Sequence, residues 1–328
     1  MAPPPRLPRP RRVALPGGAR GGAGGAPGGF PPRAVWAVSR RDLPVLAREA
    51  GFGAGAGPPV YLRRGVALGP GDAVLDVGAN VGLFALAAWE RVGPRGRVVA
   101  CEPVPPLAEA LRRNLAAAGA PAADVLECGL ADGAAASAAF TFYPGCAGWS
   151  TLAALEDPEE VARGVEAFLE RELRAPPAPG ARGGGGPPPE VRLARALKAA
   201  LPARLYLPLQ RRFVRRLLRG GLRVEARLRT VSDVLRSHDL RQVDLLKVDV
   251  ERAEAAVLAG VDAGDWPRIR QVALEAHAGP GLERCLALLR GPGGFPEVVV
   301  EPAGTNMEEA GLFNVYARRP PPAAPAKP

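Results

Sequence analysis

Cysteine, histidine and long apolar runs are scarce in this chain of 328 residues. The four cysteines, Cys101, Cys128, Cys146 and Cys285, form no C-x-x-C pair and have no histidine partner at metal-ligand spacing. This excludes the usual zinc motifs and favours a reduced interior, so we expect no metal site. No stretch approaches the roughly 18 apolar residues that span a bilayer, and the N-terminus lacks the apolar segment of a secretory signal. We therefore expect a soluble, intracellular protein without transmembrane helices.

Acidic residues are missing from the first 41 residues, which carry eight Arg, and nearly missing from residues 175–230, which carry thirteen Lys or Arg against two Glu. These segments hold net charges of +8 and +11, and subtracting both from the total of +10 leaves −9 for the rest. The basic character therefore belongs to two segments, which argues against a nucleic-acid groove over the core.

Large apolar side chains are rare at both ends of the chain. Residues 1–41 are rich in Pro, Gly, Ala and Arg, and residues 320–328 are mostly Pro and Ala. Such segments cannot offset the entropy of ordering, so we expect disordered tails. The Arg-rich start would suit an organelle transit peptide, whereas its prolines and lack of Ser favour a low-complexity tail. The location is therefore expected to be cytoplasmic or organellar.

One stretch has the pattern of a cofactor-binding turn. The apolar run Ala73–Leu75 ends in Asp76, and Gly78 and Gly82 follow before an apolar helical pattern. This is the sequence form of a strand, a tight turn and a helix. Gly78 would let a ligand approach the backbone, and Gly82 would let the helix start pack near the strand. A second strand ends in Glu102, about 20 residues on, where dinucleotide folds place an acid on ribose hydroxyls.

The spacing of this turn is D-x-G-x-x-x-G and not G-x-G-x-x-G, so it fits a pyrophosphate poorly. S-adenosylmethionine carries a ribose and an amino-acid tail but no phosphate, and it fits better. Asp132 follows a third expected strand near residues 125–128, where loops of a doubly wound sheet supply ligand contacts. A solvated turn Asp before Gly133 is the alternative.

Two later strands also end beside ionisable residues. The run Val243–Val248 precedes Asp249, and a strand from Val272 leads to Glu275 and His277. Because the carboxyl ends of parallel strands face one crevice, Asp249 and His277 are candidates for removing a proton from a hydroxyl acceptor. His277 is preferred because its pKa suits this task near neutrality, with a structural histidine as the alternative. Glu275 could orient it or bind acceptor hydroxyls, whereas Mg²⁺ held by Asp249 and Glu275 would lack a third ligand.

These patterns predict an α/β protein with a doubly wound, mostly parallel seven-stranded sheet that is interrupted by a helical insertion. The expected organisation is a tail over 1–41, a cofactor-binding half over 42–156, the insertion over 157–223, a second half over 224–319 and a tail over 320–328.

The insertion contains a basic amphipathic stretch. One helix face is predicted to carry Leu209, Phe213, Val214, Leu217 and Leu218, opposite Arg211, Arg212, Arg215, Arg216 and Arg219. The stretch could pack on the core with a solvated Arg face, form a lid over a substrate, or contact an anionic membrane or nucleic acid.

Three blocks of the chain resemble the FkbM family of S-adenosylmethionine-dependent methyltransferases. They are Val74–Gly82 with Glu102-Pro103, then Asp244–Glu251, and then Trp266-Pro267 through Glu275-Ala276-His277. The resemblance covers about residues 61–318 apart from the insertion. It implies a Rossmann-like fold and methylation of a hydroxyl on a small, sugar-like or polyketide-like acceptor. It also implies cofactor binding by the first block, which holds Asp76, Gly78, Asn80 and Gly82, and by Glu102.

Two departures from the family pattern stand out. Arg252 occupies a position where most relatives have Gly, so a cation lies beside the expected site. The long insertion exceeds a minimal domain and resembles the family members found alongside natural-product assembly enzymes.

Two other functions remain open at this point. A catalytically silent methyltransferase-fold scaffold could bind a membrane or partners through the basic insertion. A nucleotide-dependent oxidoreductase is disfavoured by the missing third glycine, and a base-methylating enzyme is disfavoured because Asp249-Val250-Glu251 lacks a following Pro-Pro-aromatic motif. Neither the acceptor nor the oligomeric state follows from the sequence.

Overall fold

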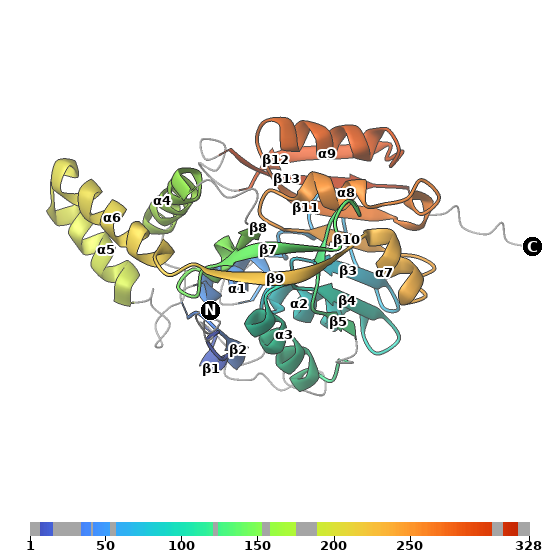
Figure 1. The fold of residues 1–328 in the computed structure, drawn as a ribbon, viewed down its shortest axis with the longest axis horizontal. Helices are drawn as coiled ribbons and strands as arrows, with labels where there is room; N and C mark the ends of the chain where they lie inside the picture. The colour runs from blue at the N-terminus through green and yellow to red at the C-terminus, as the bar shows by residue number, and fades with distance from the viewer. Residues whose placement is uncertain are drawn as a thin grey trace, which may run out of the picture.

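A seven-stranded sheet forms the centre of the computed structural model, which describes residues 7–15, 34–40, 42–52, 57–120, 124–152, 158–174, 189–303 and 311–320 (Figure 1). Its strand order is β12-β13-β11-β10-β3-β4-β5. The strands are β3 (Ala73–Val77), β4 (Arg97–Cys101), β5 (Val125–Leu126), β10 (Leu245–Val248), β11 (Gln271–His277), β12 (Glu297–Pro302) and β13 (Leu312–Arg318). The strands from β5 to β11 are parallel, and β13 is antiparallel to both β11 and β12. This confirms the predicted sheet and its closing hairpin.

Helices cover both faces of this sheet. One face carries α1 (Leu43–Glu49), α2 (Leu83–Val92) and α3 (Pro105–Ala117), and the other carries α7 (Val231–Ser237), α8 (Glu254–Ala259) and α9 (Pro280–Arg290). Successive strand residues point to opposite faces, so Val74 joins the first apolar cluster and Leu75 the second. Burial of both faces explains why these strands read as continuous apolar runs. No described helix is long and apolar enough to cross a bilayer.

A smaller sheet has the order β6-β9-β7-β8. Its strands are β6 (Gly129–Leu130), β7 (Ser137–Phe142), β8 (Thr151–Leu152) and β9 (Leu222–Arg229). Strand β7 is paired on both sides, with β8 and with β9.

The predicted helical insertion comprises α4 (Pro158–Arg174), α5 (Pro189–Ala200) and α6 (Ala203–Leu218), which extend from one side of the molecule, at the left of Figure 1. Val161 and Val165 of α4 pack with Val214 of α6 against Tyr143 and Cys146. The insertion therefore rests on the segment that follows β7.

The inner face of α6 agrees in part with the predicted one, because Val214, Leu217 and Leu218 pack against α4 and the segment after β7. Tyr206, Gln210 and Val214, spaced four residues apart, are buried, whereas Leu209 and Phe213 are exposed. The amphipathic pattern predicted the helix, but the position of α4 decides which side is covered.

The N-terminal segment departs from the expected disordered tail. Strands β1 (Arg11–Ala14) and β2 (Ala34–Ala37) pair antiparallel. The side chain of Asn114 accepts a hydrogen bond from Trp36 N at 2.7 Å and donates one to Trp36 O at 2.9 Å, which fastens β2 to α3. Residues 1–6, 16–33 and 321–328 of the predicted tails, and the predicted linker over 175–188, lie outside the described residues.

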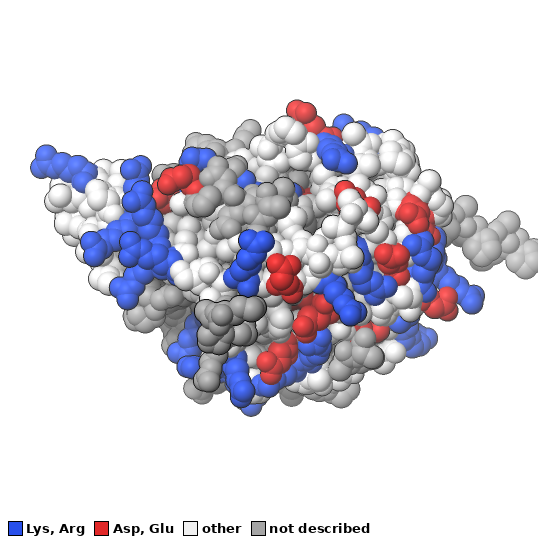
Figure 2. Space-filling model, viewed as in Figure 1, with Lys and Arg blue, Asp and Glu red and all other residues white. Residues whose placement is uncertain are grey.

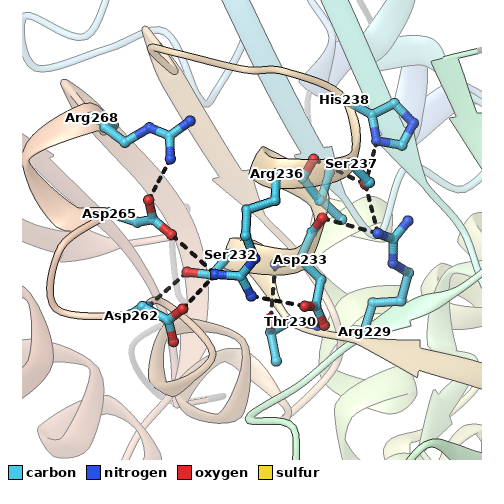
Figure 3. A network of polar contacts seen from close by, with 11 residues as sticks. Arg229, Thr230, Ser232, Asp233, Arg236, Ser237, His238, Asp262, Asp265 and Arg268 are labelled. Carbon is cyan, nitrogen blue, oxygen red and sulfur yellow. Dashed lines mark hydrogen bonds and ion pairs between the residues drawn. The ribbon is translucent and has the colours of Figure 1, made fainter.

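The start of α7 is held by a polar network (Figure 3). As predicted, Thr230 caps the helix: its hydroxyl accepts from Asp233 N at 2.9 Å, and Asp233 Oδ2 accepts from Thr230 N at 3.1 Å. Arg236 bridges Asp233 and Asp262 at 2.9 and 2.7 Å. His238 is the other of the two histidines in the chain. It lies at the end of this network and not in the cavity described below.

Candidate functional site

A cavity opens at the carboxyl ends of β3, β4, β10 and β11, where the strand order reverses between β3 and β10. Ligands of doubly wound sheets bind at this position. The cavity is lined by six of the nine residues predicted from the sequence: Gly78, Asn80, Glu102, Asp249, Glu275 and His277. The other three, Asp76, Gly82 and Asp132, are not part of its lining.

Both predicted glycines are required by neighbouring protein atoms. Gly78 has φ +75°, and a Cβ there would lie 1.8 Å from the carbonyl oxygen of Asp249. Gly82 has φ +86°, and its Cβ would lie 2.4 Å from Cδ1 of Leu111 on α3. Gly82 thus permits close packing of two helices, not of helix and strand as expected. Gly78 joins the turn after β3 to the end of β10.

Glu102 is held at the cavity edge by two backbone groups. Its Oε2 accepts from Asn80 N and its Oε1 accepts from Val104 N, both at 2.9 Å. Asn80 has φ +51°, a left-handed conformation that turns its amide toward the carboxyl. Burial raises the pKa of Glu102 to about 7, although these two N–H groups act to lower it. The carboxyl is fixed in place and can take up or release a proton near neutral pH.

Asp76 lies beneath the turn and pairs with a lysine that the sequence analysis overlooked. The ammonium of Lys247 is 3.0 Å from Asp76 Oδ1, and both residues are almost fully buried. Lys247 also donates to the carbonyl oxygen of Gly78 at 2.9 Å. Burial acts to lower the pKa of Lys247, but Asp76 and Asp249 outweigh it and raise that pKa. Asp76 therefore supports the turn from below through Lys247.

Asp249 sits between Lys247 and the cavity. Its Oδ2 accepts from the hydroxyl of Tyr61 at 2.9 Å and lies 3.5 Å from the Lys247 ammonium. The Tyr61 ring packs edge-on against Phe84 and beneath the same ammonium, 5.3 Å from its centroid. The sequence analysis assigned no role to Tyr61. The sequence signal that could have revealed this cluster is Lys247, a single lysine within an otherwise apolar strand.

His277, the last residue of β11, lies between two glutamates. Its Nε2 is 3.7 Å from Glu251 Oε2, and its Nδ1 is 3.7 Å from Glu254 Oε1. Nδ1 is buried and has no hydrogen-bond partner among the described residues. Burial acts to lower the pKa of His277, but Glu254 and Glu251 outweigh it and the pKa is raised. Burial also raises the pKa of Glu251 to about 8, so this group of side chains holds a proton near neutral pH.

Carboxyl groups dominate the charge of the cavity. Its described lining contains no Lys or Arg and includes Asp42, Glu49, Glu102, Asp249, Glu251 and Glu275. Burial and the neighbouring carboxylates, Asp249 foremost, raise the pKa of Glu275. A bound cation would lower these raised pKa values and be stabilised by the carboxylates that form, whereas a bound anion would raise them further, so the lining favours cations over anions. Among the described residues, no group of three His, Cys, Asp or Glu is arranged to hold a metal ion.

Asp132 lies in a solvated turn, which was the alternative to a role in ligand binding. It is exposed, and its Oδ1 accepts from Ala134 N at 3.0 Å in the turn that contains Gly133. Its neighbours Leu130 and Ala131 line the cavity instead.

Comparison with known proteins decides which family this cavity belongs to. The family model of the methyltransferase FkbM domain matches residues 76–165 and 209–298, and the unmatched residues between them fall within the insertion. The 31-O-demethyl-FK506 methyltransferase FkbM of Streptomyces tacrolimicus is 37% identical over 262 residues, covering 79% of this chain and 85% of that protein. The chain belongs to the FkbM methyltransferase family. It is a methyltransferase that uses S-adenosylmethionine, as its resemblance to the family predicted.

Two further relatives differ in the share of their length that this chain covers. The AMB antimetabolite synthetase AmbE of Pseudomonas aeruginosa is 35% identical over 269 residues, which cover 80% of this chain but 11% of that protein. The methyltransferase sdnD of Sordaria araneosa is 31% identical over 231 residues, covering 68% of this chain and 73% of that one. The chain thus spans only a small part of one relative and most of the others.

The residues of the cavity fit this cofactor. S-adenosylmethionine bears a sulfonium and an ammonium beside one carboxylate and is a net cation, and the lining is rich in carboxyl groups that a nearby cation would help to ionise. Glu102, fixed by two amides, would accept hydrogen bonds from its ribose, and the turn from Gly78 to Asn80 would face the rest of it.

Proposed function

We propose that this methyltransferase transfers the methyl group to a hydroxyl oxygen of a small-molecule acceptor. The observation that carries the proposal is that His277 lines the same cavity as Gly78 and Glu102. A proton acceptor and a cofactor turn are therefore available to one bound acceptor. The name of the Streptomyces relative, an O-demethyl-FK506 methyltransferase, also favours oxygen as the site of transfer.

His277 is the group we assign to proton removal. S-adenosylmethionine supplies an electrophilic methyl group when it is bound. The acceptor hydroxyl must lose its proton as it attacks, and His277 can accept that proton once its ring is neutral, a state that the raised pKa of His277 shifts to higher pH. Glu251 and Glu254, each 3.7 Å from a ring nitrogen, then stabilise the imidazolium.

Asp249 is better suited to positioning than to proton removal. One of its oxygens is already engaged by the Tyr61 hydroxyl and lies near the Lys247 ammonium. Because that oxygen is already held by two protein groups, we assign Asp249 to positioning. Glu275, on the same strand as His277, faces the cavity and is available to bind a second hydroxyl of the acceptor.

The charge of the cavity limits the acceptor. Six carboxyl groups and no Lys or Arg line its described part, so a phosphate or carboxylate next to the reacting hydroxyl would be repelled. We infer that the acceptor is uncharged or cationic around this hydroxyl. Aminated sugars, amino alcohols and neutral polyols have this chemistry.

The test is methyl transfer from radiolabelled S-adenosylmethionine to a panel of neutral, cationic and phosphorylated hydroxyl compounds. We expect label in a neutral or cationic compound, released by ether-cleaving reagents. In His277→Ala, turnover should fall by about 10²-fold or more while cofactor affinity stays within about twofold. His238→Ala is the matched control, because His238 lies outside the cavity.

Three results would contradict the proposal. Unchanged turnover in His277→Ala would remove this residue from proton transfer. Binding of the cofactor without transfer to any compound in the panel or in a metabolite extract would favour a silent scaffold. Binding of NAD in place of S-adenosylmethionine would favour an oxidoreductase.

A further inference from the structure

Large apolar side chains on α5 and α6 face solvent. Among the described residues six large hydrophobic side chains are exposed, and five of them lie on these two helices: Leu193, Leu205, Leu207, Leu209 and Phe213. Leu205 and Leu209 expose 53% and 48% of their surface. The adjacent side of α6, which carries Tyr206, Gln210 and Val214, is buried and packs on α4 through Val214. The exposed side chains therefore form a second apolar surface that the fold does not use.

The same surface carries a strong positive charge. Between residues 203 and 219 the chain has no acidic residue, and it has six arginines, all exposed: Arg204, Arg211, Arg212, Arg215, Arg216 and Arg219. Figure 2 shows Lys and Arg side chains gathered over this end of the molecule. The rest of the chain is acidic on balance, so the charge is confined to this end and to the N-terminal segment.

Apolar and basic side chains alternate around the exposed side of α6. Leu205, Leu209 and Phe213 are spaced four residues apart and form a strip along the helix. At the angular step of an α-helix, Arg212 and Arg216 lie along the same strip. On such a helix the leucines can insert into the acyl region of a membrane surface while the neighbouring arginines reach the lipid headgroups.

We propose that the outer face of α6, with Leu205, Leu209, Phe213, Arg212 and Arg216 at its centre, binds an anionic lipid surface. Nucleic acid would use the arginines but would gain little from exposed leucines. The helix stays packed on α4 and has 16 residues, so it lies along the membrane surface and does not enter the bilayer end-on. This proposal is independent of the methyl acceptor.

The experiment is co-sedimentation of the full chain with vesicles. Phosphatidylcholine vesicles are compared with vesicles in which part of the lipid is phosphatidylserine, at low and high salt. We expect binding only to the anionic vesicles, and less at high salt. Arg212→Glu with Arg216→Glu should lower the vesicle partition coefficient by about tenfold or more. Leu205→Ser with Leu209→Ser should lower it by a similar factor, because burial of apolar area is lost.

Arg284→Glu with Arg290→Glu on α9 is the matched control. It changes the net charge by the same amount at another exposed site and should leave binding unchanged. Cofactor binding and circular dichroism show that each variant is folded.

Absence of vesicle binding by the unaltered chain, or equal loss of binding in the control, would overturn the proposal. A dimer seen by light scattering and dissolved by the leucine changes, without vesicle binding, would assign the face to a second copy instead. Binding to RNA but not to vesicles would also overturn it.

Discussion

Glu102 shows how one buried carboxyl couples cofactor binding to pH. Its pKa of about 7 means that it is half protonated near neutrality. A cationic cofactor stabilises the carboxylate and lowers that pKa, so binding releases a proton. Affinity for S-adenosylmethionine should therefore fall as the pH drops below about 7, by about tenfold between pH 8 and pH 6.

Calorimetry across this pH range, with Glu102→Gln beside the unaltered chain, measures the effect. The variant should bind more weakly and with a flatter pH dependence, because it cannot ionise. Glu109→Gln, an exposed change on α3, is the control and should keep the slope. An equally steep slope in Glu102→Gln would show that another group is responsible.

Arg252 adopts a backbone conformation that disfavours its own side chain. Its φ is +77°, in the left-handed region where a Cβ costs about 1 kcal/mol or more. Glycine, which the resemblance to the family leads us to expect at this position, would fit this geometry. Arg252→Gly should therefore be about 1 kcal/mol more stable than Arg252→Ala in urea unfolding, since both lose the guanidinium but only Ala keeps the strain. If the alanine variant is at least as stable, the turn is not strained.

The sequence predicted correctly those cavity residues whose location follows from their position at the end of a strand. Glu102, Asp249 and His277 end neighbouring parallel strands, and the topology alone brings them to one cavity. The sequence could not show which way a side chain points, so Asp76 was assigned to the ligand although it faces Lys247. Nor could it show that Gly78 faces a carbonyl oxygen from residue 249, because that contact depends on the packed sheet.

At the scale of elements, β3 and β10 are joined by the buried pair of Asp76 and Lys247. Lys247→Met would leave the Asp76 carboxylate buried without its counter-ion, and we expect the free energy of unfolding to fall by about 3 kcal/mol or more. Adding Asp76→Asn should recover part of this loss. Arg112→Met, which breaks an exposed pair with Glu127, should cost less than about 1 kcal/mol. Similar urea midpoints for Lys247→Met and Arg112→Met would refute the importance of this pair.

Elements with long apolar patterns were predictable, and those that depend on a distant partner were not. The run Val243–Val248 predicted β10 because both of its faces are covered by helices. The pairing of β1 and β2 was missed because each strand is only four residues long and depends on Asn114 of α3. Leu209 and Phe213 of α6 were assigned inward together with Val214 but are exposed, because periodicity defines a helix face and does not say how much of that face α4 covers.

At the scale of the whole molecule, the basic and the acidic residues gather in different structural regions. Residues 175–230, which include α5 and α6 of the insertion, carry a net charge of +11, and the cavity holds a concentration of carboxyl groups. Val214 of α6 packs on Tyr143 and Cys146, and Ala147 and Gly148 next to them line the cavity. Ala147 N also donates to Asp42 Oδ2 at 2.7 Å, which ties this segment to α1. The insertion therefore supports one wall of the cavity without reaching the cofactor turn.

Deleting residues 175–219 should separate these two roles. Glu102 and the turn around Gly78 make no described contact with the insertion, so cofactor affinity should stay within about twofold. Loss of Val214 uncovers Tyr143 and Cys146, so the free energy of unfolding should fall by about 2 kcal/mol and the KM for the acceptor should rise. Val214→Ala in the full chain is the matched variant: it removes most of the same apolar contact, keeps the arginines, and should show the stability loss with a smaller change in KM.

If the deletion abolished cofactor binding while Val214→Ala did not, the insertion would have to shape the cofactor half directly. If acceptor KM stayed constant in both variants, the packing of α6 would have no effect on the cavity wall.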